Sequence, residues 1–203
     1  MVVKRIIGFD ASFTTIGIAV IDYEDDLLNL IYSGFYKPPG SGNLFERLSH
    51  VRKHIIKLLR KYKPDEVVLE DIIKFMRGKS NAHTITLLSA LNRTVGLAVF
   101  ETLKRPPYLV SAIDVRDIIK NGNKIPSKEE VPDLVSSILD IDFNYIIGKR
   151  GAIKDESYDI ADAIACALCY VITDMSGGKL LHEPKRISKR KKSKKRIKKR
   201  KKR

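Results

Sequence analysis

The first third of the chain has a pattern of apolar and polar positions that predicts three strands followed by a helix. Three short apolar runs, at 2–9, 17–22 and 27–35, are separated by polar turns, and the first of them is rich in β-branched residues. Such runs are typical of strands, and their close spacing predicts an antiparallel meander. From 44 to 62 the apolar residues recur every three or four positions, which predicts an amphipathic helix after the Pro- and Gly-rich loop at 37–43.

The remainder of the chain alternates strand patterns with helix patterns. Strand patterns cover 66–69 and 108–113, and helix patterns cover 84–103, 127–139 and 157–171. The middle helix pattern opens with Ser127 and Glu130, which have the spacing of a capping box. Strands first, then alternating helices and strands, predict an α/β fold, with a mixed sheet that carries helices on both faces.

The positive charge of the chain is concentrated at its C-terminal end. The net charge is +15, and positions 179–203 hold 16 Lys or Arg residues and one acid, which leaves 23 basic and 23 acidic residues before them. Like charges at this density repel one another, so we expect a disordered tail that becomes ordered only on a polyanion. We therefore divide the chain into a domain of residues 1–176 and a Lys/Arg-rich tail of residues 177–203, which could also act as a nuclear address.

Charge is also uneven within the neutral body. Residues 71–128 have a net charge of +6, whereas residues 129–178 have a net charge of −7. Between 72 and 100 there is no acid, and an aromatic residue lies among the basic ones, a combination that suits phosphates and bases. The predicted nucleic-acid-binding residues in this stretch are Lys74, Phe75, Arg77, Lys79 and Arg93. The alternative is a solvated basic loop.

Cysteine usage and hydropathy exclude several classes of protein. Cys166 and Cys169 fall in an apolar helix pattern with no second CxxC and no histidine pair nearby, so we expect a buried, reduced pair. No apolar run reaches the 18 residues of a membrane span, and the opening MVVKRIIGFD is not typical of a signal peptide. We expect an intracellular protein without a membrane partner.

Four acids stand where their carboxylates can meet. Asp10 and Glu70 each end a predicted strand, and Asp159 and Asp162 are three positions apart on one helix face. Clustered carboxylates repel one another, and Mg²⁺ is the usual compensation. Two such ions can activate a water and stabilise the leaving oxygen in phosphodiester cleavage. Each acid taken alone could instead cap a turn or form an ion pair.

Three segments together resemble the RuvC branch of the RNase H-like nucleases. They are GFDASFTTIGIAVID, VVLEDIIKFMRGKSNAHTITLLSALNRTVGLAV and YDIADAIACAL, and the resemblance covers positions 4 to 172. It implies a Mg²⁺- or Mn²⁺-dependent endonuclease with two ions per site, held by Asp10, Glu70, Asp159 and Asp162. It also implies a DNA-associated homodimer that resolves four-way (Holliday) junctions by paired symmetric nicks. Arg116 and Lys128 match family positions that bind or polarise the scissile phosphate.

The chain departs from the family pattern near Glu70. Ile73 stands where better-known members have an aromatic residue, with Phe75 two positions further on. Asp71 is an additional acid, but neighbours along a strand point to opposite sides, so we expect only one of the two acids to face the metals. The family's dimer interface lies on the helix pattern that starts near 84, whose apolar residues could belong to the interface or to the core: Leu87, Leu88, Leu91 and Val95.

Three other functions remain open at this point. The same acids and metals could cut RNA or an RNA–DNA hybrid. A non-catalytic nucleic-acid-binding protein could use the basic tail alone, although it would not need all four acids. An ATPase of the sugar-kinase class opens with a similar strand and turn, but the chain is short and lacks a convincing second Gly-rich phosphate loop.

Overall fold

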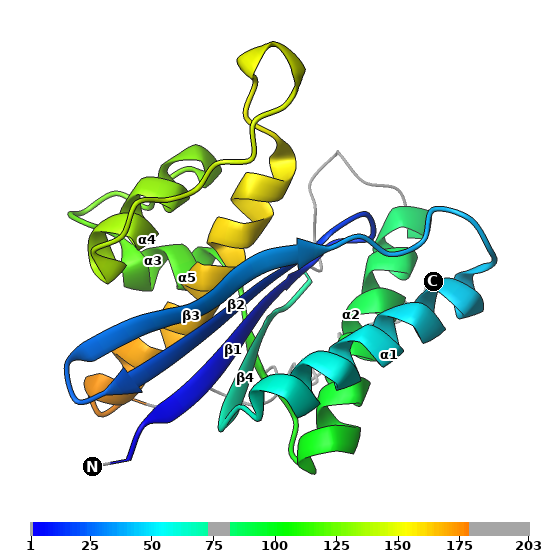
Figure 1. Ribbon diagram of the computed structural model, residues 1–203, viewed down its shortest axis with the longest axis horizontal. Coiled ribbons are helices and arrows are strands. Elements are labelled where there is room, and N and C mark those ends of the chain that lie inside the picture. Colours follow the sequence, from blue (N-terminus) through cyan, green and yellow to red (C-terminus); the bar gives the residue numbers. More distant parts are fainter. Residues whose placement is uncertain (1, 73–81, 179–203) are drawn as a thin grey trace, which may run out of the picture.

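A computed structural model describes residues 2–72 and 82–178, which form a five-stranded mixed sheet with helices on both faces (Figure 1). The strand order is β3-β2-β1-β4-β5. The strands are β1 (Lys4–Ala11), β2 (Ile16–Glu24), β3 (Leu27–Tyr36), β4 (Glu66–Glu70) and β5 (Tyr108–Val110). The first three form the antiparallel meander that the sequence predicts, β4 pairs with β1 in parallel, and β5 pairs with β4 in parallel. The predicted α/β fold is confirmed.

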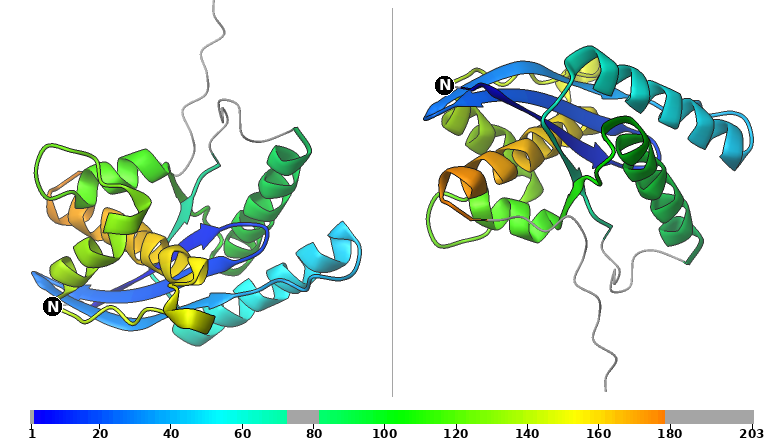
Figure 2. Two further views of the ribbon diagram at one scale, coloured as in Figure 1. Left: turned by 90° about the horizontal axis from the view of Figure 1, so that it is seen from above. Right: turned by 90° about the horizontal axis from the view of Figure 1, so that it is seen from below.

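One face of the sheet is covered by α1 (Leu44–Tyr62) and α2 (Ala82–Leu103) (Figure 2). The bounds of α1 agree with the apolar pattern because both of its ends are marked in the sequence. Asn43 and Glu46 form a capping box at its start, and Lys63, in the left-handed conformation, ends it directly before Pro64.

The other face carries α5 (Asp155–Met175), with α3 (Ala112–Ile119) and α4 (Val131–Leu139) packed around it (Figures 1 and 2). Every residue from Ser157 to Val171 except Tyr158 is buried, which explains why this segment is apolar almost all round. Cys166 and Cys169 are buried and free, as expected. No helix in the described part of the chain has the length and hydropathy needed to cross a membrane.

Two predicted elements differ from the structure. The strand expected over 108–113 ends at Val110, because Ser111 caps α3 by accepting a hydrogen bond from the Asp114 backbone N–H at 3.1 Å. That helix was not predicted. The capping box of Ser127 and Glu130 is present, but it starts a short 3-10 helix, η1 (Lys128–Glu130), and α4 begins only at Val131.

The sheet separates two hydrophobic layers, and alternate strand residues belong to each. Ile6 and Val68 face the layer that contains α5, whereas Ile7 and Phe9 pack with α1 and α2 on the opposite side. Because side chains alternate along a strand, this parity decides which layer each strand-end acid faces.

Candidate active site

The register of β1 and β4 brings two acids to the same edge of the sheet. The strands are parallel and their last pair is Phe9 with Leu69, so the next residues, Asp10 and Glu70, follow the paired segment side by side. Both lie on the face of the sheet that packs against α5, as Gly8 and Val68 do two positions earlier. The two carboxylates therefore reach the same rim on the same face.

Two glycines allow α5 to approach this rim. Gly17 on β2 pairs with Asp10, and a Cβ on Gly17 would lie only 1.9 Å from the Asp159 carbonyl oxygen. A Cβ on Gly8 would lie 2.1 Å from the Ala163 carbonyl oxygen. The helix backbone rests on the strands where they carry no side chains, which places the start of α5 beside Asp10.

The pKa shifts identify the four acids as one electrostatic cluster. Burial raises the pKa of Asp10 well above its usual value, and the charges of Glu70, Asp162 and Asp159 raise it further. Burial, followed by the charge of Asp162, raises the pKa of Glu70 to about 7. Each carboxylate is therefore costly to ionise in the folded protein unless a cation lies nearby.

Two basic side chains supply part of that positive charge. Lys128 Nζ, from η1, donates to Asp159 Oδ1 at 3.1 Å and lies 3.6 Å from Asp162 Oδ2. Arg116 Nη2, from α3, lies 3.8 Å from Asp162 Oδ1. The buried Nε of Arg116 has no hydrogen-bond partner among the described residues, so its guanidinium retains a free donor. The structure thus brings both predicted phosphate-binding residues to the acids.

The donor set suits a hard divalent cation. All four candidate ligands are carboxylates, the oxygen donors that Mg²⁺ prefers, and their raised pKa values show that added positive charge would stabilise them. Among the described residues, no three acidic, histidine or cysteine side chains are already arranged as a metal cage. The Lys128 ammonium holds Asp159 and Asp162 in this arrangement, so a metal ion would compete with it.

Asp71 faces away from the cluster, as the alternation of side chains along the strand predicts. It forms an ion pair with Arg93 on α2, with Arg93 Nη2 2.9 Å from Asp71 Oδ1. Arg93, predicted to bind nucleic acid, is therefore partly engaged within the protein. The other predicted residues of that stretch lie outside the described residues: Lys74, Phe75, Arg77 and Lys79.

Asn92 is a site residue that the sequence analysis missed. Its side chain is buried, and its Nδ2 donates to the Glu70 carbonyl oxygen at 2.7 Å. The bond ties α2 to the end of β4 and so fixes the backbone that carries the Glu70 carboxylate. The available signal was a single amide within the apolar stripe of that helix, since buried polar groups are almost always hydrogen-bonded.

The apolar stripe of α2 belongs mostly to the core. Leu91 and Val95 are fully buried against the sheet and α1, so the core alternative holds for them and an interface role for them is wrong. Leu87 and Leu88 are only partly buried. The strongly exposed apolar side chains of this helix are Leu97 and Phe100, both about half exposed.

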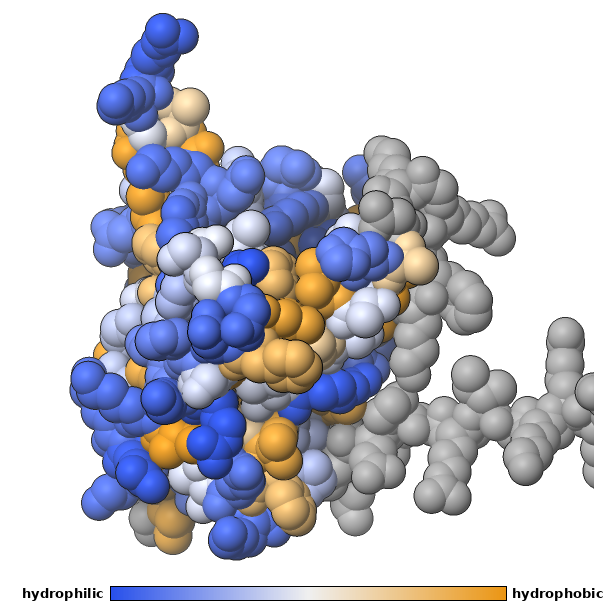
Figure 3. All heavy atoms as spheres, turned by 90° about the vertical axis from the view of Figure 1, so that its right-hand side faces the viewer, coloured by the Kyte–Doolittle hydropathy of each residue, from blue (hydrophilic) through white to orange (hydrophobic). Residues whose placement is uncertain are grey.

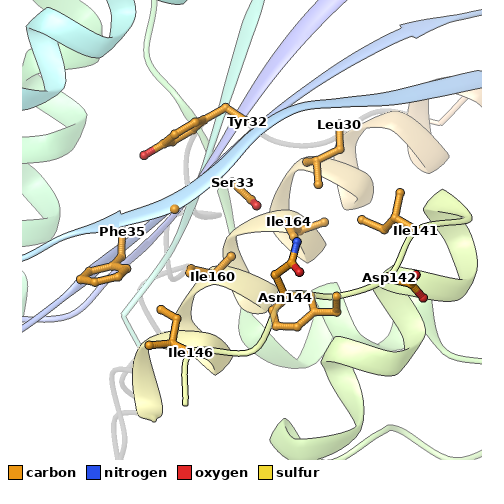
Figure 4. Close-up of a pocket in the computed structure, with 12 residues that line it drawn as sticks. Leu30, Tyr32, Ser33, Phe35, Ile141, Asp142, Asn144, Ile146, Ile160 and Ile164 are labelled. Carbon is orange, nitrogen blue, oxygen red and sulfur yellow. The ribbon is translucent and has the colours of Figure 1, made fainter. Parts of the chain in front are cut away.

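A separate pocket of about 580 Å³ lies between β3 and the segment 141–146 (Figure 4). Ile160 and Ile164 of α5 contribute to its lining, and the rest comes mainly from apolar side chains of β3 and of the facing segment. None of the four clustered acids lines this pocket. The candidate chemistry is therefore at the rim of the sheet and not in the pocket.

Glu70→Gln is expected to raise the melting temperature of the metal-free protein at pH 8. The folded state binds a proton at Glu70 more tightly than the unfolded chain does, so ionisation of Glu70 lowers stability increasingly as the pH rises from about 4.5 to 7. Glutamine cannot ionise and so removes this cost, which should raise the melting temperature by a few degrees at pH 8. The gain should disappear near pH 4. Thermal unfolding in EDTA at both pH values measures it, with Glu24→Gln at the far end of β2 as control. An equal gain at both pH values would contradict the cluster.

Comparison with known proteins gives consistent matches along nearly the whole described chain. A family model described as "Crossover junction endodeoxyribonuclease RuvC" matches residues 6–170. A protein of that name from Dehalococcoides mccartyi is 28% identical over 171 residues, which cover 82% of this chain and 91% of the relative. The solved structure "T. thermophilus RuvC in complex with Holliday junction substrate" superposes with a TM-score of 0.67 at 21% identity and covers 88% of this chain and 99% of that one. A yeast mitochondrial Holliday junction resolvase, Ydc2, superposes with a TM-score of 0.60 at 12% identity, over 83% of this chain and 78% of that one.

Proposed function

The chain belongs to the RuvC family of crossover junction endodeoxyribonucleases, and we propose that it resolves four-way DNA junctions with Asp10, Glu70, Asp159 and Asp162 as its metal ligands. The convergence of carboxylates from two strands and one helix, in which Glu70, Asp159 and Asp162 all raise the pKa of Asp10, is the observation that carries this assignment. A structural role alone would not favour so costly a cluster.

Divalent metal dependence is a property of the family, and the finer proposal is two Mg²⁺ or Mn²⁺ ions per site. Asp10, Glu70, Asp159 and Asp162 would hold the ions, which would supply an activated water and stabilisation of the leaving oxygen of the phosphodiester. The protein's own residues bind and orient the DNA strand. Lys128 and Arg116, which contact Asp159 and Asp162 here, are the basic side chains that would bind the scissile phosphate.

Paired symmetric nicks require two active sites, and we propose that the chain acts as a homodimer, as its family does. A two-fold axis through the dimer would present the same site to two strands of a four-way junction. Leu97 and Phe100, exposed on one side of α2, are the side chains of that helix that a dimer would cover. The proposed interface thus uses Leu97 and Phe100 and not Leu91 and Val95, which are buried in the core.

We propose that residues 1–176 form the nuclease domain and that residues 177–203 act as an affinity arm for DNA.

Truncation after Gly178 removes 16 basic residues and one acid, and we expect it to weaken junction binding at moderate salt. It should also flatten the salt dependence of binding, by about 0.9 in log–log slope for each phosphate that the tail would otherwise neutralise. The cleavage pattern should not change, since the acids lie in the domain. Titration of the truncated chain at several salt concentrations measures the slope, and a tail with Lys and Arg replaced by Gln should behave like the truncation. A changed cleavage pattern would show that the tail takes part in selection.

The deciding experiment offers the full chain four labelled substrates with Mg²⁺: a four-way DNA junction, a linear duplex, an RNA–DNA hybrid and a folded RNA. Paired symmetric nicks in the junction alone are expected. Cleavage of the hybrid or of the folded RNA in preference to the junction would favour the RNase H-like alternative. Binding to all four without cleavage would favour a non-catalytic protein.

A further inference from the structure

A β-hairpin projects from the molecule at the start of α5. Residues 146–154 form it, with Ile147 paired to Ile153 across the two arms (Figure 1, top). Backbone hydrogen bonds close it at both ends: Lys154 N–H donates to the Ile146 carbonyl at 2.9 Å, and Gly148 N–H donates to the Ala152 carbonyl at 2.7 Å. In the space-filling view the projection has a hydrophilic tip above hydrophobic side chains (Figure 3).

The hairpin carries all the basic residues of an otherwise acidic region. Residues 129–178 contain ten acids and only three basic residues, which are Lys149, Arg150 and Lys154. All three are exposed, and none forms an ion pair with a carboxylate of the described chain. Lys154 acts electrostatically on Glu156, whereas Lys149 and Arg150 at the tip have no acidic partner among the described residues and are available to an external anion.

The hairpin is held firmly at its base, next to the catalytic acids. The buried Ser157 accepts a hydrogen bond from Ile146 N–H at 2.8 Å through its Oγ, and its own N–H donates to the Lys154 carbonyl at 3.0 Å. Ser157 is two residues before Asp159, so the base of the hairpin lies within one helical turn of Asp159. The arm then runs from Ile146 to Gly148 and turns in a short 3-10 helix, η2 (Lys149–Gly151), so Lys149 lies roughly 10 Å beyond the base.

We propose that this hairpin is a DNA-backbone contact whose tip residues, Lys149 and Arg150, bind phosphates of the duplex arm that leads to the cleavage site. The inference rests on the proposed function, because the acids fix where the scissile phosphate lies. Duplex DNA carries one negative charge per about 1.7 Å of its axis. A tip roughly 10 Å from the hairpin base therefore meets phosphates a few positions from the cut. Lysine and arginine on phosphates position a duplex without reading its sequence.

The test variant is Lys149→Ser with Arg150→Asn in the full-length chain. Arg150 has a φ of 68°, and asparagine tolerates this left-handed conformation, so the turn should be retained. Binding of a four-way DNA junction is measured in EDTA, where the junction stays uncut, at salt concentrations from 50 to 200 mM. A variant that neutralises two fewer phosphates should have a log–log salt slope reduced by about 1.8, so that the loss of affinity is about tenfold greater at 50 mM than at 200 mM.

The matched control is Lys63→Asn with Lys104→Asn. Both lysines are exposed, both have a positive φ, and they precede β4 and β5, at the end of the sheet opposite the acids. The control removes the same charge and should keep the wild-type slope. An unchanged slope in the hairpin variant, or an equal fall in the control, would overturn the hairpin proposal while the proposed function stands. A wild-type chain that neither binds nor cuts the junction would instead overturn the proposed function.

Discussion

Asp10→Asn is expected to abolish junction cleavage and to leave junction binding within about twofold of the wild type. Asp10 lies at the centre of the cluster, since the charges of Glu70, Asp162 and Asp159 all act on it. The amide keeps the shape of the side chain and removes one anionic ligand. We expect the single-turnover cleavage rate in Mg²⁺ to fall by at least about 10³-fold, or about 4 kcal/mol of transition-state stabilisation.

Asp71→Asn is the matched control for Asp10→Asn. It replaces an acid by its amide directly after Glu70, but on the face that pairs with Arg93. We expect cleavage within about threefold of the wild-type rate and a small loss of stability, because partly exposed ion pairs contribute about 1 kcal/mol or less. If the Asp10 variant cut at the wild-type rate, or the two variants lost activity equally, the assignment of the four acids would be wrong.

Gly17→Ala is expected to damage both stability and cleavage. Its Cβ would lie 1.9 Å from the Asp159 carbonyl oxygen and 2.6 Å from the carbonyl carbon, which are backbone atoms that cannot turn aside. The helix must therefore move away from β2, and Asp159 moves with it. Overpacking of this kind costs about 1–3 kcal/mol or more, and for a chain of this size we expect the melting temperature to fall by about 4–10 °C.

The same variant should lower the cleavage rate by at least about 10²-fold even at temperatures where it remains folded, because a displacement near 1 Å has an effect of that size on a positioned reaction. Gly96→Ala is the control, since its Cβ would lie 3.8 Å from the nearest atom, an ordinary contact, and alanine favours the helix by about 1 kcal/mol. Circular dichroism melts and single-turnover cleavage measure both variants. A Gly17 variant that melts and cuts like the wild type would contradict the close packing of α5 on β2.

The sequence predicts the elements well where the signal for their ends is local. The Pro- and Gly-rich loop at 37–43 and the apolar stripe from 44 to 62 predict the bounds of α1, and Asp10 and Glu70 identify the rim of the sheet because the apolar runs stop beside them. The helix α3 was missed because its start depends on Ser111, a single residue after a strand of only three. Short elements of this kind have little periodicity to detect.

The arrangement of the site depends on contacts that no local pattern contains. The alternation of side chains predicts that Asp71 faces away from Glu70, but its pairing with Arg93 depends on where α2 packs. The same holds for the bond from Asn92 to the Glu70 carbonyl and for the roles of Gly8 and Gly17 beneath α5. Periodicity identifies a buried face, whereas tertiary packing decides which residue meets which.

The backbone of α5 packs directly on β1 and β2, and this contact affects how the sequence of such an enzyme can change in evolution. Main-chain atoms have the same shape whatever side chains surround them, so the spacing between helix and strands at this point does not depend on the size of neighbouring core residues. The outer layers can exchange one apolar residue for another over long evolutionary times while the acids keep their mutual positions. A chain that is only 21–28% identical to its relatives can in this way keep the same backbone fold.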